Sequence, residues 1–241
     1  MKAIKIICLI GLVLIFNHTK AQLKIEINDK LQDYTRDVIQ NLEDIPEERK
    51  ASLKDVGDFL VNKVRENGSY DVLFVCTHNS RRSHLADTWF KYALLFYGVD
   101  SLESYSGGLE ETAFNKNAIA ALERAGFTIH YSREVDNPAV AITPGLYPVW
   151  RMKSKVYSNK VNPKSDFVAI MVCSDADQSC PLVPGASGRF ALAYNDPRYF
   201  DSTPAQDMKY DQTAKEIAIE MFYLADYMKS QQIRKLEVTK R

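Results

Sequence analysis

A cysteine and an arginine separated by five residues carry the clearest chemical signal in this chain. Cys76 ends the apolar run 72–76. The apolar spacing from 82 to 97 predicts a helix that begins at Arg82. A strand that passes into a helix through a short polar loop exposes backbone N–H groups, which bind an oxyanion and favour the thiolate form of a cysteine. The planar Arg82 guanidinium can grip two oxygens of that anion. The sequence therefore predicts a nucleophilic thiolate beside an oxyanion site.

The loop between these two residues is predicted to bind the substrate. Its residues are Thr77, His78, Asn79, Ser80 and Arg81. Ser83, directly after the arginine, can donate its hydroxyl to the thiolate of Cys76. The alternative is a buried structural cysteine with two arginines nearby by chance, but that explains neither the polar loop nor the positions of Arg82 and Ser83.

Two further cysteines lie close together. Cys173 ends the most strongly apolar run, 166–173, and six residues separate it from Cys180. If the protein is exported, a structural disulfide is the first interpretation. Closing so short a loop would add only about 2–3 kcal/mol to the free energy of unfolding. The other interpretation is a redox pair that works with Cys76. The residues alone are compatible with both.

Asp196, followed by Pro197, is a candidate general acid. Proline restricts the backbone of the loop that would bring this carboxyl to a leaving oxygen, although a plain Asp-Pro turn is the alternative. The histidines His78, His84 and His130 lack the spacing of a zinc site. We therefore expect neither a metal nor another cofactor.

The composition and the N-terminus restrict the partners and the compartment. The chain has 31 basic and 31 acidic residues, and no basic block alternates with aromatic residues, so nucleic acid is not an expected partner. Residues 1–21 have a basic start, an apolar stretch and a final alanine, which is typical of a secretory signal peptide. We expect export, to a periplasm, with membrane contact only through this segment. An uncleaved anchor is the alternative.

Helix and strand signals alternate from 69 to 230, which predicts an α/β domain with a parallel sheet and flanking helices. The expected strands are 71–76, 102–106, an edge-like strand at 127–130, 166–173 and 189–194, and the expected helices are 82–97, 115–125 and 211–229. Residues 22–68 should form an N-terminal helical extension, and 231–241 a C-terminal tail. The proline-rich stretch 131–165 fits a flap over the site or a short hairpin.

In a parallel sheet, ligands bind where the carboxyl ends of the strands meet. Cys76, Cys173 and Asp196 all follow expected strands, so residues far apart in the sequence can converge there.

The run from Cys76 to Ser83 resembles the Cys-x5-Arg-Ser loop of the low-molecular-weight protein tyrosine phosphatase and arsenate reductase superfamily. The Cys-x6-Cys-Pro segment at 173–181 resembles that of thioredoxin-coupled arsenate reductases, and the phosphatases of this fold lack it. The resemblance covers about 70–229 and extends through 106–108, 115–118 and 195–197. Arg81 departs from the family, because many members have a second cysteine there, and Arg198 departs as well.

The resemblance implies a four-stranded parallel sheet and a site built from Cys76, Arg82 and Asp196. It further implies an arsenate reductase in which Cys173 and Cys180 pass electrons from a thioredoxin-like reductant and arsenate becomes arsenite. The alternative is a tyrosine phosphatase that hydrolyses phosphotyrosine through a phosphocysteine. A non-enzymatic module that binds oxyanions is less consistent with a thiol, an arginine and an acid together.

Overall fold

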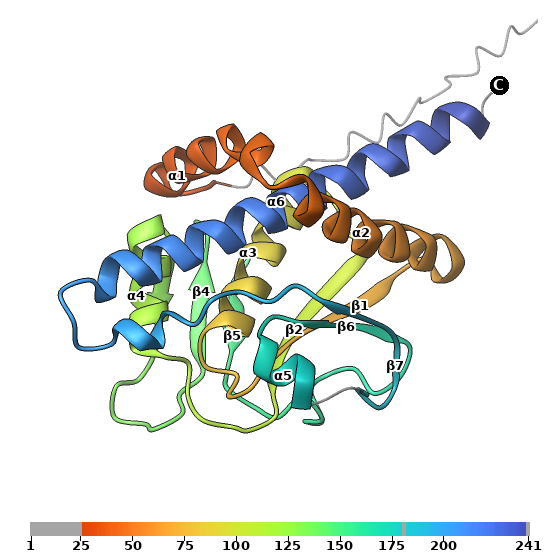
Figure 1. Ribbon diagram of the computed structural model, residues 1–241. Coiled ribbons are helices and arrows are strands. Elements are labelled where there is room, and N and C mark those ends of the chain that lie inside the picture. Colours follow the sequence, from red (N-terminus) through yellow and green to blue (C-terminus); the bar gives the residue numbers. More distant parts are fainter. Residues whose placement is uncertain (1–25, 180–181, 240–241) are drawn as a thin grey trace, which may run out of the picture.

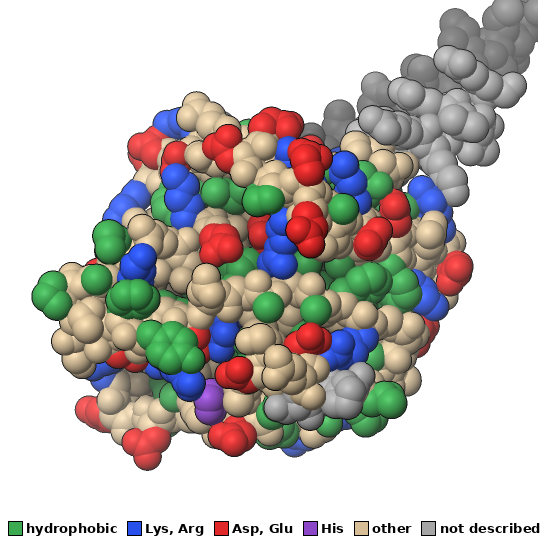
Figure 2. Space-filling view, in the orientation of Figure 1, with side chains coloured by type: hydrophobic (Ala, Val, Ile, Leu, Met, Phe, Trp, Pro, Cys, Tyr) green, Lys and Arg blue, Asp and Glu red, His purple; other side chains and the backbone are tan. Residues whose placement is uncertain are grey.

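The computed structural model describes residues 26–179 and 182–239. The expected signal peptide at 1–21 and Cys180 lie outside this part of the chain. Among the described helices, none is both long and apolar enough to cross a membrane. Acidic and basic side chains are interspersed over the face that Figure 2 shows.

A four-stranded parallel sheet forms the centre of the domain, as expected. Its strands are β1 (Tyr70–Cys76), β2 (Leu102–Gly108), β6 (Phe167–Met171) and β7 (Ala186–Ala191). The order is β2-β1-β6-β7, and every neighbouring pair is parallel. β1 and β6 are buried almost throughout because their apolar residues lie under helices on both faces, as in parallel sheets generally. Their carboxyl ends lie side by side.

Helices flank the sheet (Figure 1). Those that follow its strands are α3 (Arg82–Tyr97), α4 (Lys116–Ala125), the short α5 (Ser174–Ser179) and the long α6 (Gln206–Thr239). Of these, α3 and α5 pack directly on the sheet. α3 begins at Arg82 as predicted, whereas α6 begins before 211 and continues through most of the expected tail, 231–241. Asn115 caps α4 through its side-chain oxygen, which accepts from the backbone N–H groups of Asn117 and Ala118.

The N-terminal extension is helical. It consists of α1 (Asp29–Gln40), the 3₁₀ helix η1 (Leu42–Asp44) and α2 (Glu47–Asn67). Both α1 and α2 pack against α6 (Figure 1). Leu53, Val56 and Leu60 recur at helical spacing and are fully buried, which attaches α2 to the domain through apolar contacts.

The stretch 131–165 forms a hairpin. β4 (Val140–Thr143) and β5 (Trp150–Met152) are antiparallel, and β4 also pairs with β3 (Thr128–His130). The strand expected near 127–130 is therefore present, but it belongs to a separate three-stranded sheet rather than to the edge of the parallel one. Past the hairpin, the chain returns to the parallel sheet, where Val156 forms a parallel bridge with Gly108 at the end of β2.

Candidate active site

The nucleophile loop, residues 76–83, joins β1 to α3 and holds Cys76 in a hydrogen-bonded position. The Cys76 Sγ lies 3.1 Å from the Ser83 Oγ. The Asn79 Nδ2 donates to the same Ser83 Oγ at 2.8 Å. Because the serine oxygen is the acceptor from Asn79, its own proton is available to Cys76. All three side chains are buried, so the structure places the predicted nucleophile and the predicted donor in contact.

The nucleophile loop is braced from outside by backbone and side-chain hydrogen bonds. The Asn79 Oδ1 accepts from the backbone N–H of Lys155 at 2.9 Å, and the Ser154 hydroxyl donates to the His78 carbonyl at 3.2 Å. Asn79 has a φ of +42°, in the left-handed region. A Cβ at Gly108 would lie 2.6 Å from the Asn79 nitrogen, so only glycine fits there. No local sequence signal points to the role of 154–155, because only the tertiary fold brings that segment to the loop.

The backbone carbonyls of the nucleophile loop are directed away from its interior. The Thr77 carbonyl accepts from Glu110 N, and the Ser80 carbonyl accepts from Asn115 N, both at 2.9 Å. These bonds fix the peptide orientations, and preorganised N–H groups of this kind are what an oxyanion site requires. Binding of a substrate by residues 77–80 stays a prediction.

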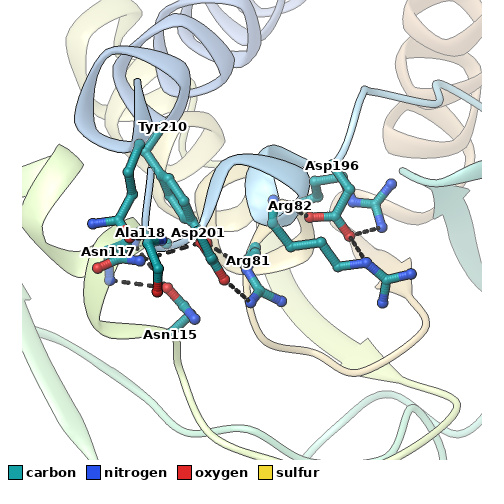
Figure 3. A network of polar contacts seen from close by, with 11 residues as sticks. Arg81, Arg82, Asn115, Asn117, Ala118, Asp196, Asp201 and Tyr210 are labelled. Atoms are coloured by element: carbon teal, nitrogen blue, oxygen red, sulfur yellow. Dashed lines mark hydrogen bonds and ion pairs between the residues drawn. The ribbon is translucent and has the colours of Figure 1, made fainter. Parts of the chain in front are cut away.

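Arg82 and Asp196 form a nearly buried ion pair. The Arg82 Nη2 lies 2.7 Å from the Asp196 Oδ2, and each side chain is only 8% exposed. The Arg82 Nη1 donates to the Tyr194 carbonyl at 3.0 Å, while the Asp196 Oδ1 accepts from the Arg198 backbone N–H. Figure 3 shows the carboxylate of Asp196 facing the Arg82 guanidinium. The predicted anion clamp and the predicted acid are thus brought together.

Arg81 points away from this pair. Its Nε donates to the Tyr210 hydroxyl at 2.7 Å, and its Nη2 lies 3.1 Å from the Asp201 Oδ2 (Figure 3). Tyr210 and Asn117 also donate to Asp201. This guanidinium ties the loop to the segment after Asp196, and binding of substrate by Arg81 stays a prediction. Its backbone remains part of the nucleophile loop.

Cys173 lies next to the nucleophile loop. Its Sγ is 3.6 Å from the Thr77 Oγ1, and the thiol is fully buried. The backbone N–H of Val172 donates to the Val75 carbonyl at 2.8 Å, which keeps the end of β6 beside the end of β1. The convergence expected at the carboxyl ends of parallel strands is thus present for Cys173. Cys180, predicted as its redox partner, lies outside the described residues.

The histidines near the loop face other groups. The buried His84 stacks on Phe114 with 4.1 Å between ring centroids, and its Nδ1 lies 3.1 Å from the Ser106 Oγ. Burial lowers the pKa of His84 well below its ordinary value, and the nearby Lys155 charge adds to this effect. The His78 Nε2 lies 3.7 Å from a Glu110 carboxylate oxygen. Within residues 26–179 and 182–239, no cluster of three or more His, Cys, Asp or Glu side chains is suited to hold a metal ion.

Comparisons with known proteins show what the chain as a whole is similar to. Residues 71–142 match the family model described as low molecular weight phosphotyrosine protein phosphatase. The arsenate reductase 2 of Staphylococcus haemolyticus (strain JCSC1435) is 32% identical over 128 residues, which cover 52% of this chain and 77% of that protein. The arsenate reductase of Staphylococcus aureus (strain Newman) is 28% identical over 153 residues, covering 63% and 94% respectively.

A solved low molecular weight protein tyrosine phosphatase from T. tengcongensis is 19% identical and has a TM-score of 0.46, over 66% of this chain and 99% of that one.

The sequence relatives define the class of protein. The chain belongs to the low molecular weight phosphotyrosine protein phosphatase family, in the wider group that includes arsenate reductases. It is an enzyme of the arsenate reductase or phosphatase type.

Proposed function

We propose that this chain is a thioredoxin-coupled arsenate reductase that uses Cys76, Cys173 and Cys180 in turn. The observation that carries the proposal is the position of Cys173. Its buried thiol lies 3.6 Å from the hydroxyl of Thr77, the residue that directly follows Cys76. Simple hydrolysis of a phosphoryl-cysteine needs no second thiol at this place. The curated relatives at 28–32% identity are arsenate reductases, which favours the same choice.

In the first step, the Cys76 thiolate attacks the arsenic atom of arsenate and forms a sulfur–arsenic bond. The oxyanion displaces Asp196 from the Arg82 guanidinium. The freed carboxylate takes up a proton from solvent and passes it to the departing oxygen, so that water leaves. The 2.7 Å contact between the two side chains keeps the acid within reach of the bound anion.

In the second step, the Cys173 thiolate attacks the Cys76 sulfur. A disulfide forms, the sulfur–arsenic bond breaks, and its electron pair stays on arsenic, which is reduced from As(V) to As(III) and leaves as arsenite. Cys180 then attacks the Cys173 sulfur and frees Cys76. An external dithiol of the thioredoxin type reduces the resulting Cys173–Cys180 disulfide.

A tyrosine phosphatase is the second candidate. Tyr199 and Phe200 follow Asp196 closely, and the Tyr199 side chain is exposed, so an aromatic substrate has a surface to contact beside the acid. Water, activated by Asp196, would then hydrolyse a phosphocysteine at Cys76, and Cys173 would not take part in turnover.

Single substitutions of the two distal cysteines separate these functions. Cys173→Ser and Cys180→Ser should each block multiple-turnover arsenate reduction with a protein dithiol as reductant. Hydrolysis of an aryl phosphate, which depends only on the Cys76 steps, should stay within about twofold of wild type. Full arsenate turnover by both variants would make the pair structural and would favour the phosphatase.

We also propose that residues 1–21 are a signal peptide and that the mature enzyme acts in a periplasm. An oxidising compartment favours the Cys173–Cys180 disulfide, so a dedicated thioredoxin-like partner must reduce it there. Mass spectrometry of the native protein should show a mature chain that begins at Gln22. Intact Met1 in a soluble cytoplasmic fraction would contradict export.

A further inference from the structure

The N-terminal extension contributes a charged group to the interior of the domain. Arg49, in the first turn of α2, donates from Nε and Nη2 to the two carboxylate oxygens of Glu220 on α6, at 2.7 and 2.8 Å. This is the bidentate geometry that holds an arginine and a carboxylate in a fixed relative orientation. The Glu220 side chain is 5% exposed, so Arg49 compensates a carboxylate that is almost removed from water.

Tyr194 connects this ion pair to the candidate active site. Its hydroxyl donates to the Glu220 Oε2 at 2.5 Å, and the Arg49 guanidinium lies 4.9 Å from the centre of its ring. Burial raises the pKa of Tyr194 well above its ordinary value, and the neighbouring Glu220 charge adds to this, so the tyrosine remains a hydrogen-bond donor. At its backbone, the Tyr194 carbonyl accepts from the Arg82 Nη1 at 3.0 Å.

A continuous set of contacts therefore leads from the extension to the acid. It runs from Arg49 to Glu220, to Tyr194, to Arg82 and to Asp196. The hydrogen bonds that hold Cys76 come from Ser83 and, through it, Asn79, which are outside this set.

We infer that Arg49 is a positioning residue for Arg82 and Asp196. By fixing Glu220, it fixes the side chain of Tyr194, whose carbonyl in turn sets the direction of the Arg82 guanidinium. The inference rests on the proposed function for the roles of Arg82 and Asp196, but it holds equally for arsenate reduction and for phosphate-ester hydrolysis. It gives the N-terminal extension a role in the chemistry.

A protection experiment on the full chain tests this. Cys76 is alkylated with iodoacetamide in the presence of increasing inorganic phosphate, and the modified peptide is quantified by mass spectrometry. Without phosphate, Arg49→Met should react as fast as wild type. With phosphate present, the same protection of Cys76 should require about tenfold more phosphate in Arg49→Met than in wild type. This factor is within the range of interaction energies between residues of one hydrogen-bond network. Arg49→Lys, which keeps the charge, should recover part of the loss.

Lys63→Met is the matched control. Lys63 lies on the same helix and pairs with Glu66 and with Asp166, far along the chain. It has no contact with Tyr194 or Glu220 among those the structure describes. Protection in this variant should equal that of wild type. An equal loss in Lys63→Met, or no loss in Arg49→Met, would overturn the inference, because Arg49 would then only attach the helix.

A second variant and a second readout cover the case in which Arg49→Met does not fold. Tyr194→Phe removes one hydroxyl and should weaken phosphate protection severalfold, and unchanged protection would overturn the inference. Both variants should lose more kcat with phenyl phosphate, whose leaving group needs protonation, than with 4-nitrophenyl phosphate. An equal loss on both substrates would also count against it.

The two proposals fail separately. If phosphate protects the wild-type Cys76 but no arsenate is reduced, the proposed function falls and the positioning role stands. If phosphate does not protect the wild-type thiol at all, the role inferred for Arg49 falls, whatever the arsenate assay shows.

Discussion

The nucleophile loop, residues 76–83, and the α5 segment, residues 173–179, follow adjacent strands but are held in different ways. Each residue from 76 to 80 has a backbone or side-chain acceptor that bonds to a segment outside the loop, and Arg82 joins the loop to Asp196. α5 has six residues, and the ion pair between Asp177 and Arg189 ties it to β7. A helix this short depends on such tertiary contacts, since isolated helices need about 12–15 residues.

The difference matches the two kinds of chemistry proposed for these regions. Stabilising an oxyanion requires donors that do not reorganise during the reaction, and a braced loop suits that proposed role. Thiol exchange requires two Cα atoms to come within roughly 4.4–6.8 Å. A helix of six residues spans about 9 Å along its axis, so we expect α5 to unwind if Cys173 takes part in the proposed exchange.

The largest expected effect comes from removing the nucleophile. Cys76→Ser should abolish both arsenate reduction and aryl phosphate hydrolysis, because a serine hydroxyl is not ionised at neutral pH. Steady-state assays of both reactions would measure it. Residual activity above about one per cent of wild type, well beyond the usual background of a lost nucleophile, would remove Cys76 from the mechanism.

Arg82→Lys is expected to have the next largest effect. An ammonium cannot bridge the Tyr194 carbonyl and the Asp196 carboxylate as the planar fork does, so kcat/KM should fall on the order of 100-fold. Arg124→Lys is the matched control, since Arg124 makes a bidentate pair with Asp211 between α4 and α6. Comparable losses in both variants would show a general effect on folding rather than on the site.

His84 tests how firmly the first turn of α3 is packed. Its folded-state pKa is lowered by burial, so below about pH 6.5 the unfolded chain binds a proton that the folded chain does not. Stability should fall as the pH drops through this range, by up to about 1.4 kcal/mol per pH unit from this group, with no contribution above about pH 6.5.

Urea unfolding of wild type, His84→Gln and His130→Gln at several pH values measures the contribution of His84 to the pH dependence of stability. His84→Gln should show a shallower acid-side slope than wild type, whereas the exposed His130 should change little. Equal slopes in all three proteins would mean that His84 can be protonated in the folded state and that the packing under the loop is looser than described.

The smallest effect is expected at α5. Asp177→Asn removes the partly exposed ion pair with Arg189 but leaves the bond from Arg189 to the Asp177 carbonyl. Such pairs contribute about 0.2–1 kcal/mol, so Cys173–Cys180 disulfide formation should accelerate up to about fivefold. Thiol titration after a pulse of oxidant gives the rate. Asp175→Asn, on the same helix, should match wild type, and a slower Asp177→Asn would show that α5 must stay helical during exchange.

Local patterns in the sequence were enough for the parallel sheet and the nucleophile loop. A buried strand is a continuous apolar run, and a helix with one buried face has apolar residues at helical spacing. These local patterns predicted β1, β6 and α3 close to their actual bounds. Cys76, Arg82 and Ser83 are near each other along the chain, so their contact follows once the strand, loop and helix form. The end of the sheet at which Cys173 lies followed from its place at the carboxyl end of an expected parallel strand, whereas only the tertiary structure decided that this strand is the neighbour of β1.

Contacts between distant segments depended on the tertiary structure. No local pattern distinguishes a flap from a hairpin at 131–165, or joins 154–155 to Asn79, since both depend on how the chain returns to the sheet. Arg81 and Arg82 are adjacent arginines, and only the placement of Asp201 and Asp196 assigns them different partners. The link from Arg49 to Tyr194 likewise exists because α2 and α6 pack together, which brings side chains 145 and more positions apart into one hydrogen-bonded group.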